Sequence, residues 1–286
     1  MGSFLLPVAK AQLHVEWVFP QNAQPKNQPP VLILHGGPGA DSRYLRPQLD
    51  RVADLGAGRP IYFYDQRGAD RSPQDEGEDP PSVAIHVEDV DAVRRYIGVD
   101  KVRLLGYSWG ALLSMLYATK YPQHVEKLIL LSPAPATAEV RQTYQRRMTE
   151  AMQRPSVIAL RDELARLRET ATPEQQRRHR FALAVSSYFV NPRRALELTP
   201  FLVKQRLEEA IWKSLGPQFD LRPKLHELAH IPTLVIHGTD DVIPIESAAE
   251  TARILSAELV ALADCGHVPY IEAPEPLFAA LTRFLA

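Results

Sequence analysis

The segment Gly-Tyr-Ser-Trp-Gly at residues 106–110 has the spacing of a serine nucleophile held on a sharp turn. A short apolar run, residues 102–105, precedes it, and a helix-like stretch, residues 111–121, follows at once. A serine between a strand and a helix sits on a strained backbone that points its hydroxyl out of the sheet. Small residues two positions before and after it let strand and helix approach closely. The pattern therefore predicts a nucleophile elbow with Ser108 at its tip.

A serine hydroxyl is a weak nucleophile near neutral pH, so it needs a histidine base that is in turn oriented by a carboxylate. Two loops downstream supply both groups, acid first and base second, each after a strand-like run. His267 is the candidate base. Asp240 and Asp241 compete for the acid role, because neighbouring loop side chains point in different directions. We favour Asp241, three residues after Gly238, and expect Asp240 to serve a turn or a helix cap.

Acyl transfer passes through an oxyanion that backbone N–H groups must stabilise. The amide of Trp109, directly after the serine, is one expected donor. The second should come from the His-Gly-Gly-Pro-Gly turn at residues 35–39, so from Gly36 or Gly37, because glycine lets the backbone approach a substrate closely. Arg67 stands between a strand end and a glycine, and we expect it to fix its loop by hydrogen bonds.

Short apolar runs alternate with amphipathic stretches near both ends of the chain, which predicts an α/β fold with a mostly parallel sheet and helices on both faces. The expected strands cover residues 12–19, 31–34, 60–64, 102–105, 125–131, 232–236 and 258–263. The expected helices cover residues 41–55, 83–97, 111–121, 247–255 and 274–285. Residues 21–30 are polar and rich in proline, which is typical of a surface loop. Residues 135–224 contain no strand-like run, so we expect a core of residues 1–134 and 225–286 interrupted by a helical cap at 135–224.

Charge is distributed unevenly, although the whole chain of 286 residues has a formal net charge of −1. Residues 135–224 hold 17 basic and 10 acidic side chains, a formal charge of +7. The arginine clusters there lack interleaved aromatic residues, so we expect solvated helix faces and no nucleic-acid binding. A preference for anionic substrates is the alternative interpretation of this charge.

No run approaches the roughly 18 apolar residues of a membrane-spanning helix, and the first residues lack the basic region of a signal peptide. We therefore expect no membrane segment. Cys265 is the only cysteine, which excludes an internal disulfide and is compatible with the cytoplasm. We expect neither a metal nor an organic cofactor.

Together these motifs resemble the prolyl aminopeptidase (proline iminopeptidase) branch of the α/β-hydrolase fold. The resemblance rests on the turn at 35–39, on Asp-Gln-Arg-Gly at 65–68 with Arg-Ser at 71–72, and on Ser-Trp-Gly at 108–110. It covers both halves of the core. It implies a serine hydrolase with a helical cap over the site, in which Ser108 is the nucleophile, His267 the base and Asp241 the acid, with Gly37 and Trp109 as oxyanion donors.

Differences from the usual pattern of this family concern the substrate. Tyr107 replaces the second glycine of Gly-Gly-Ser-Trp-Gly, and Ala-Asp at 69–70 replaces the inner pair of Gly-x-Gly-Arg-Ser. The family's cap carries a Trp-x-x-Trp-Glu stretch whose acidic residues help bind the free α-amine of an N-terminal proline; here a single tryptophan stands in a plausible cap helix, residues 202–215. The candidate substrate-binding residues are Tyr107, Glu208, Glu209 and Trp212, and a solvated helix face is the alternative interpretation of the two glutamates.

The expected function is a cytoplasmic serine hydrolase that forms an acyl-enzyme and removes an N-terminal proline from small peptides or amides. A carboxylesterase or lactonase that acts on small acyl compounds is the alternative with the same chemistry. A ligand-binding protein without catalysis is a further alternative on the same core. We expect a small-molecule or short-peptide substrate, and the oligomeric state is open.

Overall fold

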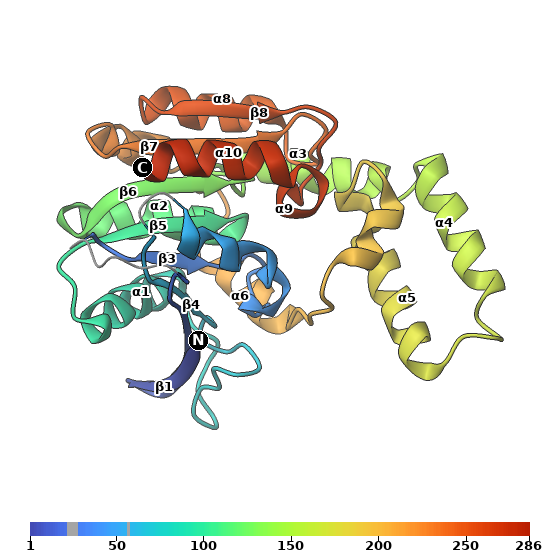
Figure 1. Cartoon of the computed structure of the whole chain (residues 1–286), viewed down its shortest axis with the longest axis horizontal. Helices are drawn as coiled ribbons and strands as arrows, with labels where there is room; N and C mark the ends of the chain where they lie inside the picture. Colours follow the sequence, from blue (N-terminus) through green and yellow to red (C-terminus); the bar gives the residue numbers. More distant parts are fainter. Residues whose placement is uncertain (22–27, 56–57) are drawn as a thin grey trace.

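The structure is a computed structural model of the chain, and it describes residues 1–21, 28–55 and 58–286 (Figure 1). An eight-stranded sheet in the order β1-β2-β4-β3-β5-β6-β7-β8 forms its centre. The strands are β1 (Gly2–Val8), β2 (Ala11–Val18), β3 (Val31–Leu34), β4 (Ile61–Tyr64), β5 (Val102–Tyr107), β6 (Val125–Leu131), β7 (Thr233–Gly238) and β8 (Glu258–Leu262). In the order β4-β3-β5-β6-β7-β8, neighbouring strands pair in parallel. Strand β2 pairs in antiparallel orientation with both β1 and β4. The mostly parallel α/β sheet predicted from the sequence is confirmed.

Helices cover both faces of this sheet. On one face pack α1 (Val83–Ile97), α2 (Trp109–Lys120) and α8 (Ile245–Ile254). On the other pack α10 (Pro274–Leu285) and the 3-10 helices η1 (Ser42–Leu45) and η2 (Gln48–Asp54). Every residue of β3, β5 and β7 is buried. Strands covered on both faces carry mostly apolar side chains, which is why these segments stand out as largely apolar runs.

Between β6 and β7 the chain leaves the sheet and forms a helical segment. Its helices are α3 (Ala138–Ala151), α4 (Pro155–Arg166), α5 (Pro173–Val185) and α6 (Gln205–Ser214), with η4 (Ser186–Tyr188) and η5 (Pro192–Glu197) between the last two and α7 (Arg222–Leu225) leading back toward the core. Figure 1 shows α4 and α5 projecting away from the sheet, whereas α6 returns to it. Leu207 and Ile211 of α6 belong to the core cluster that contains α1 and α2.

Residues 41–55, predicted as one helix, form η1 and η2 instead. Pro47 separates them, because proline lacks a backbone N–H and its ring disfavours a helical conformation in the residue before it. Arg46 is accordingly extended, with φ −112° and ψ 149°.

Strand β1 is absent from the sequence-based prediction. It pairs antiparallel with β2 at the edge of the sheet and buries only Leu6, so its apolar pattern is weak. The sequence-based prediction also lacks α9 (Pro269–Glu272), a short helix that precedes α10. Of the surface loop predicted over residues 21–30, residues 22–27 lie outside the described part of the chain.

The turn between β5 and α2 depends on two glycines that have no room for a side chain. A Cβ atom at Gly106 would lie 2.3 Å from the Gly110 carbonyl oxygen, and one at Gly110 would lie 2.0 Å from the Leu34 carbonyl oxygen of β3. Between them Ser108 has φ 53° and ψ −119°, a conformation that non-glycine residues rarely adopt. The close approach of β3, β5 and α2 therefore holds Ser108 in the strained turn that the spacing predicts.

We expect Gly110→Ala to lower the free energy of unfolding by about 3 kcal/mol or more, the upper part of the range for overpacked cores, because main-chain atoms cannot rotate away from the new methyl group. Urea unfolding measures this loss. Gly77→Ala is the control: its new Cβ meets nothing within 4 Å, so only the cost of a positive φ, about 1 kcal/mol, should appear. Equal losses in the two variants would contradict the packing described for the turn.

Candidate active site

Ser108, His267 and Asp241 come together at the carboxyl ends of parallel strands. Ser108 Oγ lies 3.0 Å from His267 Nε2, and His267 Nδ1 lies 2.8 Å from Asp241 Oδ2. The three residues follow β5, β8 and β7, whose carboxyl ends meet at one edge of the sheet. In this arrangement His267 can accept the proton of Ser108 while Asp241 stabilises the resulting imidazolium.

Asp241 is buried, and its surroundings favour the ionised carboxylate. Its Oδ1 accepts a hydrogen bond from the Ile243 amide at 2.9 Å, and His237 Nε2 lies 3.5 Å from its Oδ2. Burial by itself raises the pKa of Asp241. The neighbouring His267 and His237 and the hydrogen bonds from His267 and Ile243 outweigh burial, so this pKa lies below its usual value.

Asp240 has different surroundings. It is exposed, and its carboxylate accepts a hydrogen bond from Thr239 Oγ1 at 2.6 Å. Its backbone N–H donates to the Cys265 carbonyl at 3.0 Å, which ties the loop after β7 to the loop after β8. The structure thus separates the two aspartates that compete for the acid role: Asp241, which the sequence favours, contacts His267, and Asp240 does not.

The two glycines after β3 differ in what their amides bind. The Gly36 N–H donates to Tyr44 Oη at 2.6 Å, so it is not free for an oxyanion. Among the residues that the structure describes, neither the Gly37 N–H nor the Trp109 N–H donates to a protein acceptor. Gly37 also lines the same cavity as Ser108. Of the two glycines that the sequence leaves open, the geometry favours Gly37.

The turn after β3, the loop after β4 and the elbow are tied together by buried hydrogen bonds. His35 Nε2 accepts a hydrogen bond from the Gln66 amide at 3.0 Å, and Gln66 Oε1 accepts one from Trp109 Nε1 at 2.9 Å. Arg67 is buried and binds both carboxylate oxygens of Asp89 at 2.9 and 2.7 Å. The prediction that Arg67 fixes its loop is confirmed.

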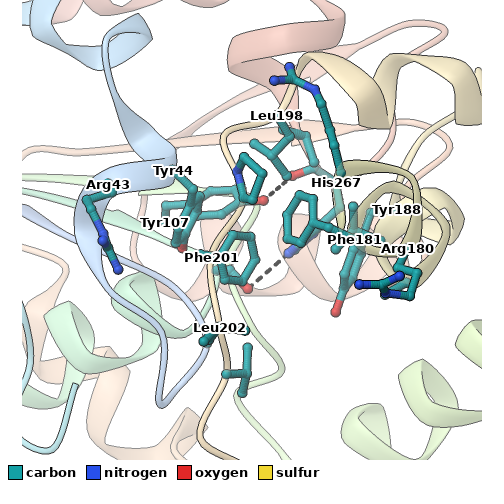
Figure 2. Close-up of a pocket in the computed structure, with 18 of the residues that line it drawn as sticks. Arg43, Tyr44, Tyr107, Arg180, Phe181, Tyr188, Leu198, Phe201, Leu202 and His267 are labelled. Atoms are coloured by element: carbon teal, nitrogen blue, oxygen red, sulfur yellow. Dashed lines mark hydrogen bonds between the residues drawn. The ribbon is translucent and has the colours of Figure 1, made fainter. Parts of the chain in front are cut away.

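A cavity of about 970 Å³ opens in front of Ser108, and both the core and the helical segment line it (Figure 2). Tyr107 and Glu208, two of the predicted substrate-binding residues, are part of its wall. The Tyr107 hydroxyl donates to the His267 carbonyl at 3.0 Å, and the two rings lie 5.3 Å apart. The side chain that replaces a glycine in the elbow therefore also supports the loop of the candidate base.

Glu209 and Trp212 lie outside this cavity, contrary to the sequence-based expectation. Glu209 is exposed and accepts a hydrogen bond from Gln205 Nε2 at 2.9 Å. Trp212 packs on Trp109, with ring centroids 5.3 Å apart, beneath the elbow. Adjacent helix positions point about 100° apart, so α6 can turn only Glu208 of the two glutamates toward Ser108.

Tyr188 and Glu272 are site residues that no sequence pattern indicates. The Tyr188 ring stacks on His267 with centroids 5.0 Å apart, and the Tyr188 carbonyl accepts the His267 amide at 2.8 Å. The Glu272 carboxylate accepts hydrogen bonds from the Gly266 amide at 2.9 Å and the Val190 amide at 2.8 Å. These contacts join the histidine loop to the segment between α5 and η5, 82 residues away in the chain.

Cys265 is buried beside this loop, and burial raises the pKa of its thiol, so it is a poor nucleophile. Across residues 1–21, 28–55 and 58–286, no group of three or more His, Cys, Asp or Glu side chains is arranged to hold a metal ion. No helix within those ranges has the length and apolar character needed to cross a membrane.

The chain is similar to known proteins over most of its length. A family model described as alpha/beta hydrolase fold matches residues 29–274. A proline iminopeptidase from Lactobacillus delbrueckii subsp. bulgaricus is 29% identical over 262 residues, which covers 85% of each chain. The crystal structure of a proline iminopeptidase-related protein from Thermus thermophilus is 26% identical, with a TM-score of 0.74 over 99% of this chain and 96% of that one. An enol-lactonase from Burkholderia xenovorans LB400, 20% identical, shares the fold with a TM-score of 0.63 over 96% of each chain.

We expect Asp241→Asn to slow labelling of Ser108 by a fluorophosphonate probe by roughly 10³- to 10⁴-fold, because an amide cannot hold His267 in the tautomer that accepts the serine proton. Asp240→Asn is the matched control and should label at the wild-type rate. Time courses of labelling followed by mass spectrometry measure both rates. Equal slowing in the two variants would show that Asp241 is not the acid.

Proposed function

Because the chain belongs to the alpha/beta hydrolase fold family, we propose that it is a serine hydrolase with Ser108 as nucleophile, His267 as base and Asp241 as orienting acid. The hydrogen-bond chain from Asp241 through His267 to Ser108, which opens onto the cavity, carries this proposal. Ser108 attacks a carbonyl carbon as His267 takes its proton, and the N–H groups of Gly37 and Trp109 stabilise the oxyanion. His267 returns the proton to the leaving group, and water then releases the acyl group from the serine.

The proposed substrate is a short peptide or amide with an N-terminal proline. The likeness to a proline iminopeptidase supports it, and so does the position of Glu208 in the cavity wall. Glu208 is partly buried, and its pKa is raised, chiefly by burial. A desolvated carboxylate gains most from a cation beside it, and the free α-amine of a peptide is such a cation.

The proposed division of the chain is a core, residues 1–134 and 225–286, and a cap, residues 135–224. Ser108, Asp241 and His267 belong to the core, whereas Tyr188 and Glu208 belong to the helical segment. In this division the core performs the chemistry and the cap selects the substrate.

We also propose a cytoplasmic location. The single cysteine, Cys265, is buried and cannot form an internal disulfide, which suits a reducing compartment. The proposed partners are limited to short peptides or other small substrates.

We expect the protein to release 4-nitroaniline from proline 4-nitroanilide. The Ser108→Ala variant should turn over this substrate at least roughly 10³-fold more slowly. A short-chain 4-nitrophenyl ester tested alongside separates the two candidate activities. Hydrolysis of the ester alone would end the aminopeptidase proposal and favour the esterase or lactonase alternative. The fold that this chain shares with an enol-lactonase is compatible with that alternative.

We expect Glu208→Gln to raise the KM for a proline substrate roughly tenfold or more, because a charge-assisted hydrogen bond contributes about 1.5–3 kcal/mol. The KM for a neutral ester should stay unchanged. Glu209→Gln, one position along α6 and outside the cavity, is the matched control. Since the pKa of Glu208 is raised, the wild-type KM for a proline substrate should also rise as the pH falls through that pKa and the carboxylate is protonated. Identical KM values for all three proteins would remove Glu208 from the binding site.

A further inference from the structure

Arginine side chains line the part of the cavity formed by α5 and η1. They outnumber the carboxylates of the wall, so the lining carries a formal excess of two positive charges. The charged lining residues are Arg43, Glu174, Arg177, Arg178, Arg180 and Glu208. Part of the positive charge of the helical segment, on exposed arginines of α5, therefore faces the same cavity as the candidate nucleophile.

These arginines differ in what they already bind. Arg43 pairs with Asp41 at 2.6 Å, and Arg178 donates from both Nε and Nη2 to a backbone carbonyl. Within the part of the chain that the structure describes, Arg177 and Arg180 make neither an ion pair nor a side-chain hydrogen bond. Two guanidinium groups at the cavity are thus without a bonded carboxylate among the described residues.

Helix α5 separates these two groups from the segment that covers the candidate base. Its last residue, Val185, is followed by η4, where Tyr188 stacks on His267. Arg180 and Arg177 precede Val185 by five and eight residues, about 8 and 12 Å along the helix at 1.5 Å per residue. Figure 2 shows Arg180, Phe181 and Tyr188 along one wall of the cavity. The cavity wall on α5 between Arg180 and η4 consists of Phe181, Ala184 and Val185, all apolar.

We propose that Arg177 and Arg180 form a subsite for a carboxylate at the far end of the substrate, so that the enzyme prefers short peptides with a free C-terminus. An extended peptide advances about 3.3 Å per residue, so two to four residues span the roughly 8 to 12 Å of α5 that separate Val185 from the two arginines. Arginine suits this role because its planar fork binds both oxygens of a carboxylate.

This subsite deepens the proposed function and rests on it. Glu208 meets the amine at one end of the peptide, and the two arginines meet the carboxylate at the other. A short free peptide carries both charges. A peptide with a C-terminal amide offers only the N-terminal amine, and so does a long chain whose C-terminus lies far from the site.

The test compares the tetrapeptide Pro-Ala-Ala-Ala with its C-terminal amide, in the wild type and in the double variant Arg177→Gln/Arg180→Gln. The wild type should favour the free acid in kcat/KM by about fivefold, and the preference should shrink as salt is added. The double variant should lose the preference while it cleaves the amide at the wild-type rate, which also shows that it is folded. Arg166→Gln, an exposed arginine of α4 outside the cavity, is the control and should keep the preference.

Equal cleavage of acid and amide by the wild type, or a preference that persists in the double variant, overturns the subsite. If no proline peptide is cleaved at all, the aminopeptidase proposal fails instead. The same variants are then compared on 4-acetoxybenzoate and on the neutral 4-acetoxybenzamide, esters in which the carboxylate or the amide belongs to the leaving group, as it does in the peptide. A preference for the acidic ester that the double variant loses supports the subsite without the peptidase, and the absence of any preference rejects both.

Discussion

The backbone contact between β3, β5 and α2 is the constraint on which the rest of the site depends. Gly106 and Gly110 let these three elements touch through main-chain atoms, and Ser108 is held between them at φ 53°. The Ser108 amide donates to the Leu131 carbonyl at 2.9 Å, so β6 fixes the turn from the other side. A serine held in this way needs no rearrangement to meet its base, and the elbow also leaves the Trp109 amide without a protein acceptor among the described residues.

The histidine loop is supported by the core and by the helical segment together. Tyr107 of β5 binds the His267 carbonyl, Tyr188 binds the His267 amide and covers its ring, and Glu272 joins the same loop to Val190. The position of the candidate base is therefore coupled to the position of the segment that lines the cavity. A change in that segment would reach the base directly, through main-chain hydrogen bonds.

Charged side chains around the cavity have three distinct environments, and each suits a different role. Asp241 is buried between two histidines, which keeps its pKa low and its carboxylate ionised. Glu208 is partly buried at the cavity wall, where burial raises its pKa and favours a cationic ligand. The arginines of α5 lie farther out and lack a carboxylate partner among the described residues. In the proposed roles, the same types of charge orient a base, meet an amine or meet a carboxylate, depending on how strongly each is desolvated.

The sequence by itself determined what depends on local geometry and periodicity: the alternating α/β core, the elbow around Ser108, and the order of Asp241 and His267 after their strands. These follow from side-chain sterics and apolar patterns that act over a few residues. The sequence favoured Asp241 over Asp240 as the acid, but only tertiary structure could place its carboxylate against His267. Tertiary structure alone decided that Glu208 rather than Glu209 faces the cavity, and that Trp212 supports the elbow. It also replaced the predicted helix over residues 41–55 with two 3-10 helices and brought Tyr188 and Glu272 to the histidine loop. Each of these depends on the direction of one side chain or on contacts between distant segments, and such contacts leave no periodic trace in the chain.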